Sequence, residues 1–391
     1  MVYLADVSRF HSYLHTTQAI LTQYRGETPF AYFIRNCFGA SRKYGSRDRR
    51  VISNLCYCFF RTGQWGKNLS VGERILGGLF LCSETADEVL SQLRPEWNEQ
   101  VHLPLPQKMK LVNCLPEAVF PWIFEISNQL QSDAFVLSHF IQPDLFLRLR
   151  PGWEEQVTAI LRHSNILFSR EGNCVRLPNG TAVEELLELD RMAVVQDKSS
   201  QRLGEFYLEA DQGLAHGSYS AWDCCAASGG KSILVHDINP AARLTVSDIR
   251  KSILVNLKKR FAKAGIQRYH SVVADLTEQR PSDKYQLILC DAPCTGSGTW
   301  SRTPEQLAFF DVGRIRHYES LQKNILCQVA KNLANGGYLV YSTCSVFARE
   351  NEEVARWAEK ELKLELIRSG YFTGYQEKAD TLFGALFRRS L

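Results

Sequence analysis

Two cysteines follow apolar, strand-like runs and are the residues of this chain best suited to covalent chemistry. Cys294 lies just beyond the run Leu287–Cys290, and Cys344 lies just beyond Leu339–Tyr341. The carboxyl ends of strands in a parallel α/β sheet line the ligand crevice, and a cysteine thiolate is a strong nucleophile. Their positions therefore predict a reaction at strand ends in which a sulfur atom bonds to the substrate.

The chemistry that best uses two such thiols is methylation of a pyrimidine ring. Carbon 5 of cytosine is a poor nucleophile until a thiolate adds at carbon 6, after which it attacks an electrophilic methyl group. A base then removes the carbon 5 proton and the thiol leaves. Either cysteine alone is as well explained as a small buried side chain, but the recurrence of both in strand-end turns favours the catalytic interpretation.

A small-residue loop after another strand-like run predicts a cofactor site. Small residues let a ligand approach the backbone closely. The phosphate-loop pattern fails because Cys225 stands where its first glycine is required, and the dinucleotide pattern fails as well. A nucleoside cofactor without a phosphate chain fits better. The predicted cofactor-binding residues of this loop are Cys225, Ala226, Ala227, Ser228, Gly229, Gly230 and Lys231.

Acidic residues end three successive predicted strands. Asp248 lies nineteen residues after Gly229, near the spacing at which a carboxylate accepts hydrogen bonds from ribose hydroxyls. Asp275 follows the next strand and could accept from an adenine amino group, and Asp291 follows the one after it. Each is also explained as a turn or helix-cap residue.

From residue 193 onward the pattern is α/β. Helices are expected over 252–264 and along Leu321, Ile325, Val329 and Leu333, the latter ending at Gly336-Gly337. The run 381–387 is either a last strand of the sheet or an interface element. The expected strands are 220–224, 243–247, 271–274, 287–290 and 338–342.

Residues 1–135 show helical periodicity, and residues 143–192 indicate a small α+β module. The segment 41–50 carries five basic residues, which are explained either as a phosphate-contacting surface or as a solvated helix start capped by Ser46. In the module, a helix is expected over 154–163. Arg148 and Arg150 either touch nucleic acid or are plain exposed positions of a half-buried strand.

Bulk properties are those of an ordinary globular protein. The chain has 391 residues, 45% hydrophobic and 23% charged, with a net charge of +4, so charge alone argues weakly for a polyanionic partner. Its twelve cysteines show no zinc-site spacing. There is no signal-peptide pattern, and the apolar stretch 75–82 is too short to cross a bilayer. A cytoplasmic monomer without membrane or metal association is expected.

Five blocks together resemble the RsmB/Nop/Sun family of RNA 5-methylcytosine methyltransferases. The basic N-terminal block resembles the NusB-like domain found on the bacterial 16S rRNA branch of that family. The resemblance implies a Rossmann-like S-adenosylmethionine-dependent domain at 193–391. It also implies an RRM-like RNA-binding module at 143–192 and an all-α NusB-like RNA-binding domain at 1–135. The blocks are 195–201 (VQDKSSQ), 225–231 (CAASGGK), 291–300 (DAPCTGSGTW), 341–345 (YSTCS) and 350–353 (ENEE).

The resemblance also implies residue roles. Cys344 corresponds to the family nucleophile, and Cys294 to the cysteine that assists breakdown of the covalent adduct. Asp291 and Lys231 would contact the target base, with Asp291 also near the methyl-bearing end of S-adenosylmethionine. The loop 225–231 would hold that cofactor together with Asp248 and Asp275. The family usually has proline where this chain has Ser228, which predicts a less rigid loop.

Three functions remain open at this point. The leading one is methylation of a 16S rRNA cytosine, and the runner-up is the same chemistry on tRNA. The third is an RNA-binding ribosome-assembly or antitermination factor whose catalytic domain has decayed. Against this last hypothesis, Lys231, Asp291, Cys294 and Cys344 are all present.

Overall fold

The chain folds into two compact units, which are described separately below. The computed structural model describes residues 2–41, 43–215, 217–278 and 282–390. The helical unit comprises residues 1–124, 131–142 and 300–311, and the sheet unit comprises 125–130, 143–299 and 312–391. Arg42 of the basic segment lies outside the described residues. The domain limits given above stay predictions, as do the likenesses to NusB and RRM domains.

Amphipathic helices build the helical unit around an aromatic core. On α2, residues Phe30, Ile34 and Phe38 recur at helical spacing and are buried. On α3, Ile52 and Leu55 are also buried, against α4. The helices of this unit are α1 (Val2–Gln23), α2 (Phe30–Ala40), α3 (Ser46–Arg61), α4 (Val71–Cys82), α5 (Glu88–Leu93), α6 (Pro95–Asn98), α7 (Leu105–Leu111), α8 (Pro116–Val119), α9 (Ser132–Ser138) and α15 (Pro304–Ala308).

The basic segment before α3 is partly engaged within the unit. Ser46 is the first helical residue rather than the cap, and the Asp48 carboxylate accepts the Gly45 N–H at 2.9 Å. Arg47 binds Glu88 at 2.7 Å, and Arg49 donates to the Tyr44 carbonyl at 2.9 Å. These contacts are exposed and stabilise little. The phosphate-contacting role of this segment stays a prediction.

A segment distant in the sequence, residues 300–311, completes the core of the helical unit. Trp300 is buried against Phe120, with ring centroids 5.9 Å apart. Leu307 is fully buried, and the Glu305 carboxylate accepts the Phe30 N–H at 3.2 Å, where α2 begins. Residues 300–311 therefore fold with the N-terminal helices, although sequence analysis assigned them to the α/β region.

The small sheet of the sheet unit has four antiparallel strands in the order β2-β3-β1-β4. Its helix α10 (Glu154–His163) has the predicted bounds. A short 3-10 helix, η2 (Val183–Glu185), links β3 to β4. The strands are β1 (Leu145–Leu149), β2 (Ser169–Glu171), β3 (Cys174–Leu177) and β4 (Ala193–Val195).

Both interpretations of Arg148 and Arg150 are wrong. The two residues are only 5% and 9% exposed, and their guanidinium groups bind Asp237 at 2.5 and 2.6 Å. Asp237 lies on α13 (Gly230–Ile238). Its carboxylate supplies the counter-charge that allows the two arginines to be buried. The alternation of apolar and basic residues marks a strand buried on both faces.

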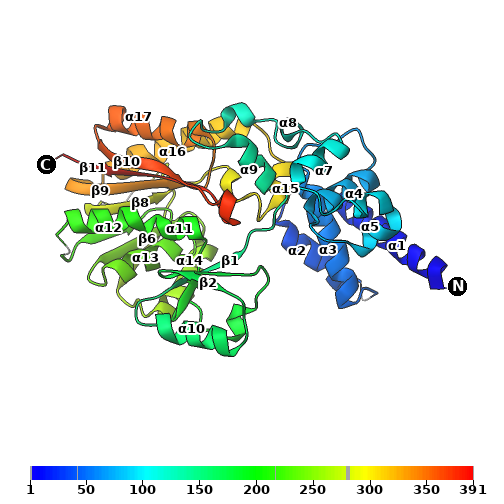
Figure 1. Ribbon diagram of the computed structural model, residues 1–391. Coiled ribbons are helices and arrows are strands. Elements are labelled where there is room, and N and C mark those ends of the chain that lie inside the picture. Colours follow the sequence, from blue (N-terminus) through cyan, green and yellow to red (C-terminus); the bar gives the residue numbers. More distant parts are fainter. Residues whose placement is uncertain (1, 42, 216, 279–281, 391) are drawn as a thin grey trace. The chain divides into compact units, whose positions relative to one another are not determined.

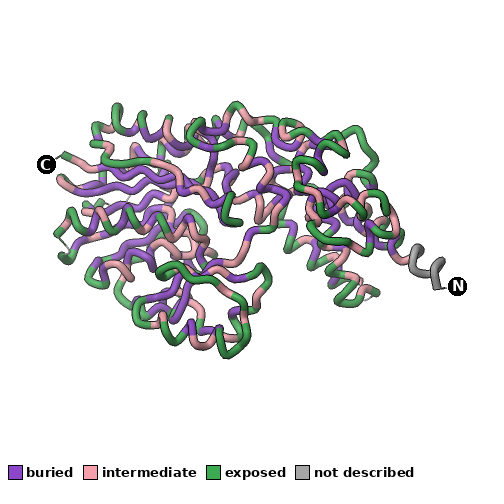
Figure 2. Tube along the Cα trace, viewed as in Figure 1, coloured by how far each residue is buried: buried purple, intermediate pink, exposed green. Residues whose placement is uncertain are grey.

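The main sheet has the strand order β10-β11-β9-β8-β5-β6-β7, in which β11 runs antiparallel to its two neighbours and the other pairs are parallel. Helices α16 and α17 cover one face, and α12, α13 and α14 cover the other (Figure 1). Most of its inner strands are buried along their length (Figure 2). The predicted α/β Rossmann-like fold is confirmed.

The five strands predicted in this larger part of the sheet unit occur in the predicted order as β5 to β9, whereas β10 was not predicted. The run 381–387 is a strand, β11. The strands are β5 (Ser220–Asp223), β6 (Arg243–Asp248), β7 (Tyr269–Val273), β8 (Tyr285–Asp291), β9 (Leu333–Thr343), β10 (Glu365–Phe372) and β11 (Leu382–Arg388). The helices besides α13 are α11 (Lys198–Arg202), α12 (Gly204–Gly213), α14 (Lys251–Ala264), α16 (Gly313–Ala330) and α17 (Glu352–Leu362).

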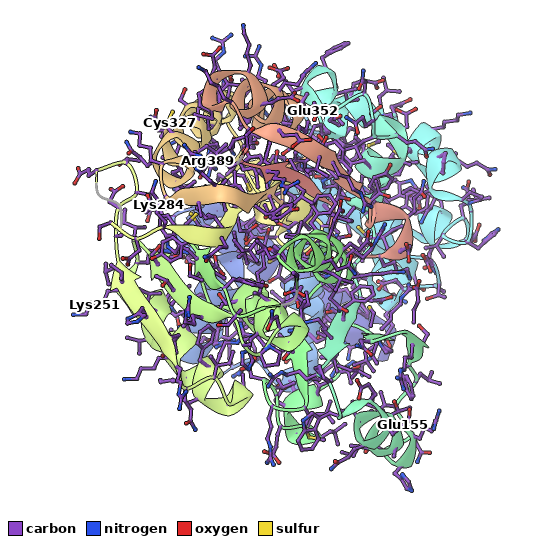
Figure 3. All side chains as sticks on the ribbon, turned by 90° about the vertical axis from the view of Figure 1, so that its left-hand side faces the viewer. Glu155, Lys251, Lys284, Cys327, Glu352 and Arg389 are labelled. Carbon is purple, nitrogen blue, oxygen red and sulfur yellow. The ribbon has the colours of Figure 1, made fainter. Side chains whose placement is uncertain are left out.

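Helix α16 ends earlier than its apolar spacing predicts. Leu333 belongs to β9, where it pairs with Tyr285, and Gly336-Gly337 lies inside that strand. Cationic side chains satisfy the last carbonyls of the helix, as is favourable at a C-terminus. Arg389 donates to the Ala330 carbonyl at 2.8 Å and Lys284 to that of Lys331 at 2.6 Å; both residues are labelled in Figure 3.

Candidate active site

The candidate site lies where the order of the parallel strands reverses. From β5 the chain builds β6 and β7 on one side and then crosses to β8 and β9 on the other. Ligands bind outside the carboxyl ends of strands at such a switch point. Asp223 ends β5 and Asp291 ends β8. On β9, Ser342 pairs with Asp291, so the next turn brings Cys344 to the same edge.

The two predicted cysteines meet. The Sγ atoms of Cys294 and Cys344 are 3.4 Å apart, and both residues are partly accessible. The pKa of the Cys294 thiol is raised well above its usual value, first by its hydrogen bond with Cys344, then by burial and by the charges of Cys344 and Glu350. A raised pKa favours the protonated form of Cys294, so its thiol can donate a hydrogen bond to the neighbouring sulfur.

Lys231 and Asp291 form an ion pair beside the thiols. The Lys231 Nζ lies 2.6 Å from one carboxylate oxygen of Asp291, and the Ser342 hydroxyl donates to the other at 2.9 Å. Burial by itself lowers the pKa of Lys231, but the Asp291 carboxylate outweighs it and the net shift is upward. A fixed ammonium and a fixed carboxylate are thus available to a ligand at this edge.

A cavity of about 290 Å³ brings most of the predicted residues together. Its lining includes eight of the twelve, from the cofactor loop, β8 and the turn after β9: Cys225, Ala226, Ala227, Ser228, Gly230, Lys231, Asp291 and Cys344. Cys294 reaches this group through its contact with Cys344. The remaining three have other surroundings.

Gly229, Asp248 and Asp275 do not line the cavity. Gly229 has φ +84°, and a Cβ there would come within 2.7 Å of Phe261, so glycine is needed for packing and conformation. Asp248 supports the loop from behind, accepting the Ala227 N–H at 3.0 Å. Asp275 accepts the N–H and hydroxyl of Thr277, the turn role considered for it from sequence. Cofactor contacts of these residues stay predictions.

Sequence reasoning did not single out Asp223 or Arg260, which also line the cavity. The Nη1 atom of Arg260 donates to the carbonyl and hydroxyl of Ser228 at 3.0 and 2.8 Å. Its Nη2 atom lies 2.7 Å from the Asp190 carboxylate. The loop is therefore held by an arginine at the position where the family usually has proline. Asp223 ends β5, two residues before Cys225 at the start of the loop, and could have been found; Arg260 gave no local signal.

The chain matches, over residues 215–381, the family described as 16S rRNA methyltransferase RsmB/F. A ribosomal RNA small subunit methyltransferase B from Proteus mirabilis is 30% identical, over 80% of this chain and 83% of that protein. This chain belongs to the RsmB/F family. A relative of the same name from Pectobacterium atrosepticum is 28% identical, over 84% of this chain and 86% of that one. The resemblance expected from the five blocks is confirmed, and the chain is an RNA methyltransferase by family.

Solved structures support the fold over the whole length. A crystal structure of the protein PH0851 covers 98% of each chain with a TM-score of 0.69 at 17% identity. NSun6 from Pyrococcus horikoshii, solved with SFG, covers 69% of this chain and 97% of its own, with a TM-score of 0.59 at 13% identity. At these identities the likeness concerns the fold alone.

Metal and membrane features are not found among the described residues. Within the described ranges, there is no group of three or more His, Cys, Asp or Glu side chains arranged to hold a metal ion. None of the described helices is long and apolar enough to cross a membrane. All twelve cysteines are free thiols.

The arginine clamp on the cofactor loop predicts a binding defect. Arg260→Ala removes two hydrogen bonds from Ser228, and loss of charged hydrogen bonds of this kind should weaken cofactor binding about tenfold. Calorimetric titration with S-adenosylhomocysteine measures the effect, with the exposed neighbour Lys259→Ala as control. Adding Ser228→Pro to the Arg260 variant should recover part of the affinity. Equal affinity of wild type and Arg260→Ala would contradict the clamp.

Asp223 predicts a pH-dependent stability. Burial raises its pKa to about 7; the Ser232 hydrogen bond opposes this rise and the Asp291 charge adds to it. The folded protein then binds the Asp223 proton more tightly than the unfolded chain does. The stability that this proton contributes is fully present below the ordinary aspartate pKa of about 4 and is lost as the pH rises through about 7. The thermal midpoint of ligand-free Asp223→Asn, relative to that of the wild type, should therefore rise between about pH 5 and pH 8. A difference between the two proteins that stays constant with pH would contradict this.

Proposed function

We propose that the protein transfers a methyl group from S-adenosylmethionine to carbon 5 of a cytosine in 16S rRNA, through a transient bond between Cys344 and carbon 6. The observation that carries the proposal is the Cys294–Cys344 pair, with sulfur atoms 3.4 Å apart beside the Lys231–Asp291 ion pair. Membership of the RsmB/F family and the names of the relatives support rRNA as the substrate.

Cys344 acts first, because carbon 5 must be made nucleophilic. Its thiolate adds to carbon 6, and the ring electrons move to carbon 5, which then takes the methyl group. S-adenosylmethionine would supply that group as an electrophilic methyl on a sulfonium and would leave as S-adenosylhomocysteine. Removal of the carbon 5 proton by a base re-forms the 5,6 double bond and expels the Cys344 thiolate, so the enzyme returns unchanged.

Cys294 and the ion pair serve the other steps. Cys294 is in contact with the attacking sulfur and assists adduct breakdown by donating its thiol proton to the Cys344 sulfur as the bond to carbon 6 breaks. The Lys231 ammonium and Asp291 carboxylate contact the ring and exocyclic nitrogen of the base and stabilise the charge that develops there.

The cavity residues fit a cationic nucleoside cofactor. Asp223 Oδ1 is buried with no hydrogen-bond partner among the described residues, while its Oδ2 accepts from Ser232 at 2.5 Å. Asp197, Asp291 and Asp380 also line the cavity. S-adenosylmethionine carries an ammonium and a sulfonium, both complementary to this acidic lining. Asp223 would hold the ammonium, and the loop 225–231 would approach the nucleoside.

The target base must leave its helix to reach these groups. A cytosine stacked in an A-form duplex presents neither carbon 6 nor carbon 5 to a side chain held in a cavity. We therefore expect an unpaired or flipped nucleotide as substrate.

The experiment is transfer of radiolabelled methyl to 16S rRNA from a strain that lacks this gene, followed by bisulfite sequencing. We expect label in 16S rRNA and one restored 5-methylcytosine. Label in tRNA instead would move the substrate to tRNA. Tight RNA binding with no transfer to either RNA would leave only the RNA-binding factor.

A further inference from the structure

Glu350 is a fully buried carboxylate between the two cysteine-bearing turns. It ends the short helix η4 (Ala348–Glu350) and has 0% exposure. Its oxygens accept the Thr295 N–H at 2.8 Å, the Thr295 hydroxyl at 2.5 Å and the Ser345 hydroxyl at 2.7 Å. Thr295 directly follows Cys294, and Ser345 directly follows Cys344. One carboxylate therefore holds the residue next to each thiol.

A third element fixes the same point. The Gln322 side-chain amide, on α16, donates to Glu350 at 3.1 Å and to the Pro293 carbonyl at 2.9 Å. The Glu350 carbonyl in turn accepts the Tyr341 hydroxyl of β9 at 2.5 Å. The turn that carries Cys294 is thus held on both sides of the cysteine, at Pro293 and at Thr295.

Hydroxyl groups complete the connection between the two turns. Thr295, Ser297 and Ser345 lie within 3.2–3.3 Å of one another through their Oγ atoms. Ser297 also accepts the Val346 N–H at 2.9 Å. All three residues are buried, with at most 5% exposure. Such a buried hydrogen-bonded network favours one geometry.

Burying a carboxylate this deeply is costly unless its oxygens are bonded. Burial raises the pKa of Glu350, and its hydrogen bonds from Ser345, Thr295 and Gln322 oppose the rise. If only packing were required, an apolar side chain of similar volume would fill the site at a lower cost in free energy. The four donors instead converge from the two turns and α16, which indicates a role in setting their separation.

We propose that Glu350 is a positioning residue that sets the distance between the Cys294 and Cys344 thiols. The inference rests on the proposed function, in which the two sulfurs act on one base in succession. Cys344 must reach carbon 6, and Cys294 must remain in contact with it during breakdown. A misplacement of about 1 Å can cost about 100-fold in rate, so a rigid link between the turns is a requirement of the reaction.

The first test measures thiol separation without RNA. The full-length protein is treated with dibromobimane, a short bifunctional thiol reagent, and the linked peptides are mapped by mass spectrometry. We expect a Cys294–Cys344 link in wild type and in Glu353→Gln, an exposed residue of the same segment used as control. Glu350→Ala should lose most of this link, and Glu350→Gln, which keeps the shape and most hydrogen bonds, should retain it.

The second test measures the chemical step. At saturating RNA and S-adenosylmethionine, single-turnover methyl transfer should fall about 100-fold in Glu350→Ala, with KM for the cofactor unchanged and partial recovery in Glu350→Gln. If Glu350→Ala does not fold, Thr295→Val replaces it in both tests. That variant removes the Thr295 hydroxyl, with its bond to Glu350 and its contacts to Ser297 and Ser345, but keeps the N–H bond to Glu350. A smaller loss of both link and rate is therefore expected.

The outcomes separate the inference from the function on which it rests. Wild-type link yield and rate in the folded Glu350→Ala variant, or in Thr295→Val where that variant replaces it, would overturn the positioning role. Absence of methyl transfer in wild type itself would overturn the proposed function instead, while the cross-link would still report whether Glu350 sets the thiol separation.

Discussion

Replacing Cys344 with alanine is expected to abolish methyl transfer and to leave no covalent complex with RNA. Without the sulfur, carbon 5 of the base never becomes nucleophilic. The other thiol in the described cavity lining, that of Cys225, has a pKa raised well above its usual value. Removal of an enzyme nucleophile costs on the order of four to six powers of ten in rate. Single-turnover transfer of labelled methyl to 16S rRNA measures the loss.

Two controls make the Cys344 result specific. Cys327→Ala removes a half-buried thiol of α16, outside the cavity lining, and should leave the rate unchanged. RNA affinity of Cys344→Ala, measured by filter binding, should match wild type, since the variant loses one sulfur atom. Transfer by Cys344→Ala at the wild-type rate would overturn the assignment of the nucleophile.

Replacing Cys294 with alanine is expected to accumulate a covalent protein–RNA complex. Cys344 can still add to the base in this variant, but the neighbouring thiol that assists breakdown is gone. Because the pKa of Cys294 is raised by its hydrogen bond with Cys344, by burial and by nearby charges, Cys294 is suited to proton transfer rather than attack. The complex should appear as a slowly migrating band in a denaturing gel.

The double variant Cys294→Ala/Cys344→Ala is the matched control, because it lacks both thiols and should give no band. Turnover of Cys294→Ala should fall while its first methyl transfer persists. Normal turnover without a band would show that breakdown does not need Cys294.

Much of this site could be predicted from sequence because its parts are local. The blocks around Cys294, Cys344 and Lys231 are short segments at strand ends. Their residue types indicate the chemistry that they can carry out. The strand order then brings them together, because the carboxyl ends of parallel strands share one edge. Local periodicity also gave the bounds of α10, and the run 381–387, interpreted as a strand or an interface element, lies largely in β11.

The rest depends on partners distant in the chain. Asp237 buries Arg148 and Arg150 from about ninety positions away, and Arg260 reaches Ser228 across thirty-two. The α16 periodicity continues to Leu333, but pairing with Tyr285 places that residue in a strand. Such pairings leave no local pattern, so sequence reasoning also missed the part that Glu350 plays between the two turns.

The most direct test of the central claim is mass spectrometry of the complex trapped with Cys294→Ala and digested with protease and nuclease. The account predicts one peptide, containing Cys344, whose sulfur carries a methylated cytidine nucleotide. A nucleotide attached to any other residue, or methyl transfer by this variant without a nucleotide-linked peptide, would contradict it.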